Sequence, residues 1–579
     1  MKRKWAVGLS IVMSSLLLFS GCSSSTEETT TESGTTTTTE ETTTDETATD
    51  ETATDETTEE GGEATSSTGN VAMDNALEKM GTVTVANGEG ADKDTITFIS
   101  VVEPTSLEPG GVASSDSNFR VVITQIYETL VRESPTDRTV LQPLLAESWE
   151  IAEDGMSVNF TLKQNVKFHD GSTMTAEDVA FSLNRAIGLA TNADLSEMMD
   201  NAEVVDDTHV VLNLKYPYAP VVNILTNPNF SIMSQAYVEQ CEADGTNLAR
   251  NPMGTGAYKF VEWVNGASIT MEAFDEWNGG EVSIPNLIFN FITDTTTAAI
   301  ALESGDAQLL YGCDSADMPR LIANPDVNVM SVQSGGFYFL TLNTQAEVLS
   351  DVNVRKAIQL AINRQEVIDG GQDGLGWDTP VPITPGIFGY PENYEGVQQD
   401  QEQAKQLLAD AGYADGVTVQ FICPESNYYS RPAQVIQEQL RQVGINAELT
   451  IMERGAFDTD LSNRNFEMSY SWIGCSYPDA DNIVYKLFHS QYANTTGQTN
   501  MANVVNEEAD RLVEEARSST DSAEREDLYR QLCELNDENA WYIAILTSTN
   551  TIVASAEVGG VAGNAGSFYY VSDYTYQPE

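Results

Sequence analysis

Apolar and polar residues follow one another along most of the chain in an order that predicts alternating strands and helices. Residues 95–102 and 466–473 are apolar, rich in β-branched and aromatic side chains, and of the length of a strand. Residues 433–443 place apolar side chains at helical spacing, Gly444 follows as a helix stop, and residues 445–451 are predicted as the next strand. This order of helix, glycine and strand is typical of an α/β domain.

The same helical spacing predicts further helices. The helix at 175–187 begins with Thr175, and Asp178 stands three residues later, which is the arrangement of a capping box with Asp in place of Glu. The other predicted helices span residues 119–131, 352–362 and 405–413.

Residues 466–488 join a predicted strand to a predicted helix through a polar loop. After Gly474 this loop holds Cys475, Ser476, Tyr477, Asp479 and Asp481, and apolar residues return at helical spacing from residue 483. A strand that ends in a polar loop and leads into a helix is how α/β proteins build binding crevices. The stretch therefore predicts a ligand site. The alternative is a surface turn with two solvated aspartates.

Composition and charge narrow the class of partner. The chain has 579 residues, enough for several domains, and its hydrophobic fraction of 41% with a mean hydropathy of -0.26 is that of a soluble globular protein. Its 28 basic and 88 acidic residues give a formal net charge of -60. That charge argues against binding to nucleic acid or to an anionic membrane surface, because both need clustered Lys and Arg.

The N-terminal segment predicts export and lipid anchoring. Basic residues precede an apolar run at 6–19, and the sequence Leu-Phe-Ser-Gly leads to Cys22. This resembles the bacterial lipobox, in which the signal is cleaved before a cysteine that receives a lipid. The alternative is a secretory signal with an incidental cysteine. Residues 23–70 hold 14 acidic residues and no Lys or Arg, and residues 23–94 are predicted to form a disordered tether.

The sequence carries no recognisable signature of catalysis or of metal binding. Its other five cysteines are widely spaced without a CxxC pair, and His169, His209 and His489 lie far apart. No nucleophile elbow, P-loop or HExxH helix occurs. We therefore expect a protein that is not an enzyme and that has no metal and no cofactor. A secreted surface hydrolase, with Asp479 and Asp481 as paired carboxylates, is the alternative from another class.

Short motifs in chain order carry a family resemblance. They are IYETLV (126–131), LLAESWE (144–150), FTLKQNVKFHDGSTMTAEDVAFSLNR (160–185), NPMGTGAYKFVEW (251–263), FLTLNT (339–344), DVNVRKAIQLAINRQEVI (351–368), QAKQLLADAGYADG (403–416), AQVIQEQLRQVGINAEL (433–449) and YPDADN (477–482). Together they resemble the extracellular solute-binding proteins of ATP-driven (ABC) importers. The group in question is the large one that carries oligopeptides, dipeptides, nickel complexes and some oligosaccharides.

The resemblance implies an α/β fold of the two-lobed periplasmic-binding-protein kind (type II) with an extra inserted domain. Its lobes would close on a ligand around a hinge. For Trp149, His169 and Asp170, which lie in the family motifs, we expect structural roles. The implied parts are a lipoprotein signal peptide at 1–22, the tether at 23–94, lobe I at 95–130, 231–342 and 546–579, the inserted domain at 131–230, and lobe II at 343–545.

The resemblance also implies where a ligand binds, and it leaves the ligand class open. Ser476 stands where peptide-binding relatives carry the aspartate that holds the ammonium group of a peptide. Cys423 stands where dipeptide-binding relatives carry an arginine for the carboxylate, and Arg431 lies eight residues on. Peptide is the leading ligand class, and an oligosaccharide or another neutral solute is the alternative. The predicted ligand-binding residues are Trp472, Cys475, Ser476, Tyr477, Asp479, Tyr428, Tyr429 and Arg431.

The function implied by these observations is solute capture for import. We expect a monomeric substrate-binding protein that is held at the extracellular face of the cell membrane by a lipid on Cys22. Its partners would be a small-molecule or peptide ligand and the permease and ATPase subunits of an ABC importer, without nucleic acid.

Overall fold

The computed structural model describes residues 93–111, 117–497 and 499–576. The chain divides into two units, Met1–Thr65 and Ser66–Glu579, and all described residues belong to the second unit. The predicted signal segment, Cys22 and the tether as far as residue 92 lie outside the described residues.

A seven-stranded sheet organises the first large α/β layer. Its strand order is β12-β19-β11-β1-β10-β9-β8, so it gathers strands from distant parts of the chain. β1 pairs in parallel with β10 and β11, and the other pairs are antiparallel. The strands are β1 (Thr95–Ser100), β8 (Tyr258–Val264), β9 (Ser268–Ala273), β10 (Asn286–Phe291), β11 (Leu309–Tyr311), β12 (Val327–Gln333) and β19 (Thr549–Ser555). The associated helices are α2 (Ser117–Ile123), α6 (Gln235–Asp244), α7 (Thr295–Glu303) and α8 (Met318–Ala323).

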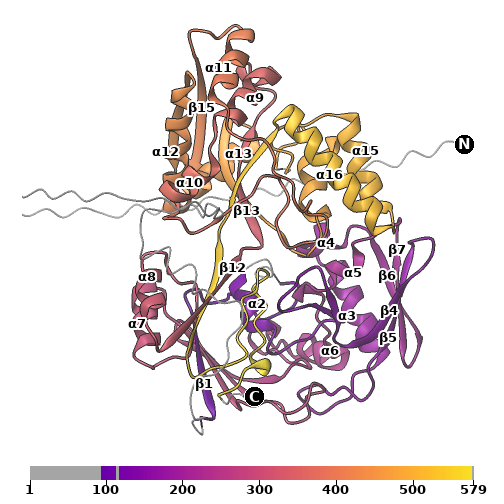
Figure 1. The fold of residues 1–579 in the computed structure, drawn as a ribbon. Helices are drawn as coiled ribbons and strands as arrows, with labels where there is room; N and C mark the ends of the chain where they lie inside the picture. Colours follow the sequence, from indigo (N-terminus) through magenta and orange to yellow (C-terminus); the bar gives the residue numbers. More distant parts are fainter. Residues whose placement is uncertain (1–92, 112–116, 498, 577–579) are drawn as a thin grey trace, which may run out of the picture. The chain divides into compact units, whose positions relative to one another are not determined.

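A six-stranded sheet in the order β14-β18-β13-β17-β15-β16 organises the second layer, with β15 parallel to β16 and β17. Helix α12 packs on β15 and β16, and Figure 1 shows it beside α10 at one side of β15. The strands are β13 (Gly336–Leu342), β14 (Trp377–Asp378), β15 (Val417–Pro424), β16 (Ile445–Met452), β17 (Met468–Gly474) and β18 (Tyr542–Thr547). The helices are α9 (Val352–Ala361), α10 (Arg364–Gly371), α11 (Gln401–Asp410), α12 (Asn427–Gln442), α13 (Arg454–Asn463), α14 (Asp481–Phe488), α15 (Glu507–Ser518) and α16 (Ser522–Asn539).

A smaller antiparallel sheet in the order β4-β5-β7-β6 has its own core and lies within the predicted inserted domain. Helix α3 covers it and begins with the predicted capping box: Thr175 and Asp178 each accept a backbone N–H of the other. The elements of this part are β2 (Val131–Glu133), β3 (Leu141–Pro143), β4 (Ala146–Ile151), β5 (Ser157–Leu162), α3 (Ala176–Gly188), α4 (Ala193–Ser196), β6 (Met199–Asp206), β7 (His209–Leu214) and α5 (Val221–Ile224).

The chain crosses between the two large sheets at two points that lie side by side. β12 leads through Ser334 and Gly335 into β13, and β18 leads through Ser548 into β19 (Figure 1). The backbone N–H of Ser334 donates to the carbonyl of Ser548 at 2.7 Å, and their hydroxyl oxygens lie 3.2 Å apart. β13 and β18 both belong to the second sheet, so this sheet also includes residues just before 343 and just after 545.

The predicted helix at 119–131 is too long: α2 ends at Ile123. The following backbone is bound by another part of the chain, because Gly256 donates its N–H to the carbonyl of Ile126 and Tyr258 donates to that of Gln125, both at 2.9 Å. A side chain on Gly254 would place its Cβ 2.2 Å from the Ile126 carbonyl oxygen, so a glycine is needed for this close approach. The motif at 251–263 thus ends the helix through tertiary pairing.

Candidate ligand-binding site

Two adjoining cavities lie between the two large sheets. They are next to Ser334 and Ser548, where the chain crosses from one sheet to the other. The first has a volume of about 510 Å³ and the second of about 530 Å³. Four of the described residues line both cavities: Tyr311, Ser334, Trp472 and Asn550. Volumes of this size suit a small solute or a short peptide.

Trp472 projects from β17 into both cavities. It stands opposite Tyr338 of the neighbouring β13, and 43% of its surface is exposed. Gly336 makes room for the indole ring, since a Cβ at this position would lie 2.4 Å from Trp472 Cζ2. An aromatic side chain that stays exposed in a cavity is available to stack on a ligand.

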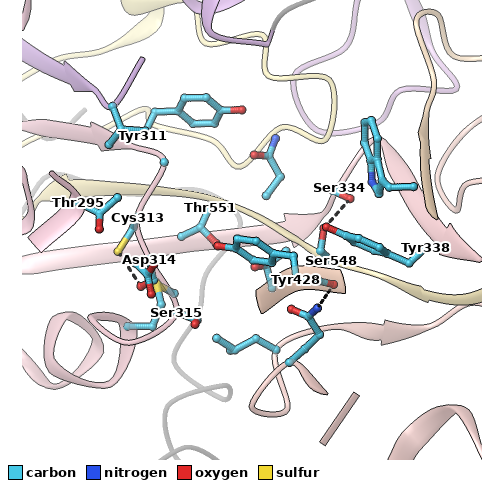
Figure 2. A pocket seen from close by; sticks show the side chains of 18 of the residues that line it. Thr295, Tyr311, Cys313, Asp314, Ser315, Ser334, Tyr338, Tyr428, Ser548 and Thr551 are labelled. Atoms are coloured by element: carbon cyan, nitrogen blue, oxygen red, sulfur yellow. Dashed lines mark hydrogen bonds between the residues drawn. The ribbon is translucent and has the colours of Figure 1, made fainter. Parts of the chain in front are cut away.

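Side chains from both sheets face each other across the first cavity (Figure 2). Tyr338 and Tyr428 come from the second layer, and Tyr428 is 43% exposed with its carbonyl bound by the Gln372 amide at 3.0 Å. Asp314 comes from the first layer, and one of its carboxylate oxygens accepts the backbone N–H of Ala316 at 2.9 Å. The cavity thus combines aromatic faces with hydroxyl, amide and carboxylate groups.

The second cavity is bordered by the start of the polar loop after β17. Cys475 is buried, its thiol contacts the carbonyl of Tyr477 at 2.7 Å, and burial raises its pKa to about 11, so the group is a neutral thiol at physiological pH. Ser476 lines the same cavity. Its backbone is held by Asn482 and Asn227, at 2.8 and 3.2 Å, so the position of the loop is fixed on both sides.

Both aspartates of the loop are held in ion pairs with arginines. Asp479 is buried with Arg525 at 2.8 Å, and Asp481 is buried with Arg517 at 3.0 Å. Neither carboxylate lines either of the two cavities. The alternative of solvated aspartates on a surface turn is therefore wrong, and the carboxylates hold the loop in place.

The other predicted ligand residues lie outside the walls of these two cavities. Tyr477 is buried in the core of the smaller domain, and its hydroxyl lies 2.9 Å from that of Tyr218. Tyr429 packs on Tyr338 with ring centroids 5.3 Å apart. Arg431 forms an exposed ion pair with Asp373. The structure thus places Trp472, Tyr428, Cys475 and Ser476 at the cavities and Tyr477, Asp479, Tyr429 and Arg431 behind or beside them.

Arg120 is a cavity residue that sequence reasoning missed. It lies on α2, it is 7% exposed, and it lines the second cavity together with Ser476. A lone arginine in an amphipathic stretch gives no local signal of a site. Only the fold brings it to the loop after β17.

Three further features of the described residues concern metal ions, membranes and cysteines. No group of three or more His, Cys, Asp or Glu among them is arranged to hold a metal ion. Within the same residues no helix has the length and apolar character to cross a membrane. The five cysteines described, Cys241, Cys313, Cys423, Cys475 and Cys533, are free thiols.

Comparisons with known proteins agree with one another. Residues 140–495 match the family described as bacterial extracellular solute-binding proteins, family 5 Middle. Heme-binding protein A of Haemophilus influenzae is 26% identical over 82% of this chain and 90% of its own length. The dipeptide-binding protein of Escherichia coli is 27% identical over 80% of this chain and 91% of its own. The structure of the periplasmic binding protein DppA from Helicobacter pylori, in complex with the peptide STSA, superposes with a TM-score of 0.68 at 26% identity and covers 83% of this chain and 98% of that one.

Proposed function

The chain belongs to the bacterial extracellular solute-binding proteins of family 5, and on that premise we propose that it captures a peptide for import. The observation that carries the proposal is the pair of adjoining cavities between the two lobes, with Trp472 in the wall of both. Aromatic surface gives affinity for peptide side chains, and closure of the lobes would exclude water. No covalent step is needed.

The ligand would contact the four predicted residues that line the cavities. Trp472 and Tyr428 offer ring faces, whereas Ser476 offers a hydroxyl and Cys475 a neutral thiol. Tyr477, Asp479, Tyr429 and Arg431 would support the cavity walls without touching the ligand. This narrower set is our proposal for the binding site.

The proposal also covers the location of the protein in the cell and its partner proteins. We propose that a lipid on Cys22 anchors the chain at the outer face of the cell membrane and that the acidic segment after it acts as a flexible tether. The loaded protein would act as a monomer and pass its solute to the permease of an ABC importer, which is driven by ATPase subunits.

An oligosaccharide is the second candidate ligand. The first cavity is favourable for it in one respect, because Ser334, Ser548, Thr549 and Thr551 line it and their hydroxyls suit those of a neutral sugar. The aromatic residues of the cavity fit either ligand class, and identification of the bound compound separates the two.

Native mass spectrometry tests the proposal directly. The full chain is purified from detergent-solubilised membranes, any retained compound is released and identified, and the emptied protein is then offered synthetic peptides and neutral oligosaccharides. We expect stable retention of peptides without their cleavage. Retention of sugars alone would contradict the peptide assignment, and turnover without a stable complex would favour the hydrolase instead.

A further inference from the structure

Arg120 carries a buried guanidinium whose hydrogen bonds are incomplete. Its Nη1 donates to the carbonyl of Gly566 at 3.3 Å, and its Cζ lies 5.5 Å from the centre of the Phe568 ring. Its Nε is buried without a hydrogen-bond partner among the described residues. A buried donor of this kind is costly unless something else satisfies it. Since Arg120 lines the second cavity, a bound molecule can reach it.

Among the described residues the positive charge of Arg120 also lacks a counter-ion of its own. The nearby carboxylate of Glu133 is taken by Arg138, whose Nε and Nη2 donate to its two oxygens at 2.6 and 3.2 Å. Within the described residues Arg120 forms no ion pair. One carboxylate therefore stands near two guanidiniums and pairs with only one of them. Burial lowers the pKa of Arg120, which is the direction expected for a cation that is poorly compensated.

Arg138 adds to the same excess of positive charge. Its Nη1 is buried without a hydrogen-bond partner in the described part of the chain, and it lies 3.2 Å from where a Cβ on Gly335 would be. Gly335 lines the second cavity, and none of the described residues that line that cavity is acidic. In a chain with a net charge of -60, this wall of the cavity is thus locally cationic.

We propose that the solute carries an anionic group, a carboxylate, that binds to Arg120 in the second cavity. This deepens the proposed function and rests on it. Nη1 already donates to Gly566 and Nε has no partner among the described residues, so the guanidinium keeps donor capacity for a carboxylate oxygen. Because Arg120 is already buried without a ligand, its own desolvation adds little to the cost of binding, and the ligand supplies the opposite charge.

The charged side chains that line the two cavities predict how the ligand is oriented. Among the described residues that line either cavity, Asp314 carries the one carboxylate, and it lies in the first cavity. A solute with an anionic end in the second cavity would therefore place any cationic end toward the first. The anionic group can be the terminal carboxylate of a peptide or a carboxylate on a side chain, and the experiment separates these sources.

The probes are trialanine, its C-terminal amide, the tripeptide Ala-Glu-Ala as its C-terminal amide, and maltotriose. Binding of each to the full chain is measured by titration calorimetry for the wild type, Arg120→Gln, Arg120→Lys and the control Arg441→Gln. Arg441 is an exposed residue of α12 that pairs with Glu438. Loss of a charge-assisted pair costs roughly tenfold or more in affinity, so we expect trialanine to bind at least about tenfold more weakly to Arg120→Gln, with partial recovery in Arg120→Lys.

The preference for a peptide acid over its amide shows whether Arg120 contacts the ligand or has only a structural role. The wild type should prefer the acid over the matched amide, and Arg120→Gln should lose this preference even if its thermal midpoint falls. Recovery of binding by the glutamate side chain of the amidated peptide would assign the group to a side-chain carboxylate. Equal binding of trialanine and its amide by the wild type would overturn the inference and leave the proposed function intact. Binding of maltotriose alone, or of none of the probes, would contradict both.

Discussion

The Nη2 atom of Arg525 donates to both carboxylate oxygens of Asp479, at 2.8 and 3.0 Å, and both side chains are buried. Arg525 also donates from Nε to the carbonyl of Ala516 at 2.7 Å, so the pair links the loop after β17 to the end of α15. Asp479 is thus a structural anchor of the loop and is not available to neutralise a cationic ligand.

Asp479→Asn should destabilise the protein strongly. The change leaves the buried Arg525 without its counter-ion, and removal of one partner of such a pair typically costs about 3–5 kcal/mol. Urea unfolding followed by circular dichroism measures the loss. The matched control is Glu438→Gln, which breaks an exposed pair on α12 and should change the midpoint little. Equal effects of the two changes would contradict the structural role.

Trp472→Ala should weaken ligand binding by about tenfold or more, because a half-exposed indole in both cavities acts as an aromatic anchor. Its exposure also predicts that the thermal midpoint falls by only a few degrees. The peptide retained by the wild type serves as the probe. Trp263→Phe, on β8 and outside both cavities, is the control. A collapse in stability without a specific loss of binding would show that the indole serves the core.

His169 should make the protein less stable in mild acid. Its Nε2 lies 2.9 Å from the Gly256 carbonyl, and burial lowers its pKa from 6.5 to about 4, so the folded state holds the ring neutral. An unfolded chain takes up the proton near pH 6.5. The contribution of His169 to stability is therefore full above pH 6.5 and is lost as the pH falls toward 4.

His169→Gln should accordingly flatten the fall of the melting temperature between pH 7.5 and 4.5. The control is His209→Gln, which removes a half-exposed ring that bonds to Asp206 and lies outside these contacts. Parallel curves for all three proteins would rule out a role for His169. The structural role that we expected for this residue is consistent with its contacts to the motif at 251–263.

Cys22→Ala should release the protein from the membrane, because the residue that we propose receives the lipid is lost. Fractionation of cells and immunoblotting of membrane and soluble fractions measure the shift. Ser24→Ala, two residues further along, is the matched control and should remain in the membrane fraction. If the Cys22 variant stays membrane-bound, the lipobox assignment is wrong.

Local sequence signals predicted those parts of the fold that local physics determines. The capping box at Thr175, the helix stop at Gly444 and the strand at residues 445–451 were all readable, because each depends on neighbouring residues. The helix at 119–131 was not, since its second half is bound by residues that lie far along the chain. The start of α12 was missed because Ser426 caps it well before the apolar spacing begins.

The candidate site was predictable in position and less so in its members. The loop after β17 does border a cavity, but nothing in the sequence tells whether Asp479 points toward a ligand or toward Arg525. The partner lies 46 residues away, on a helix whose packing only the fold determines. The same limit applies to Arg120. Its proposed role follows from the lack of an ion-pair partner among the described residues, and only the fold reveals that lack.

The paired crossings at Ser334 and Ser548 have a consequence for how the molecule melts. Chains with several domains often unfold in separate steps. Here β12 and β13 are consecutive strands in different sheets, as are β18 and β19, and the two junctions are bonded to each other. Loss of either sheet frees strand ends in the other, so the two sheets should unfold together as one cooperative unit, seen in calorimetry as a single heat-absorption peak.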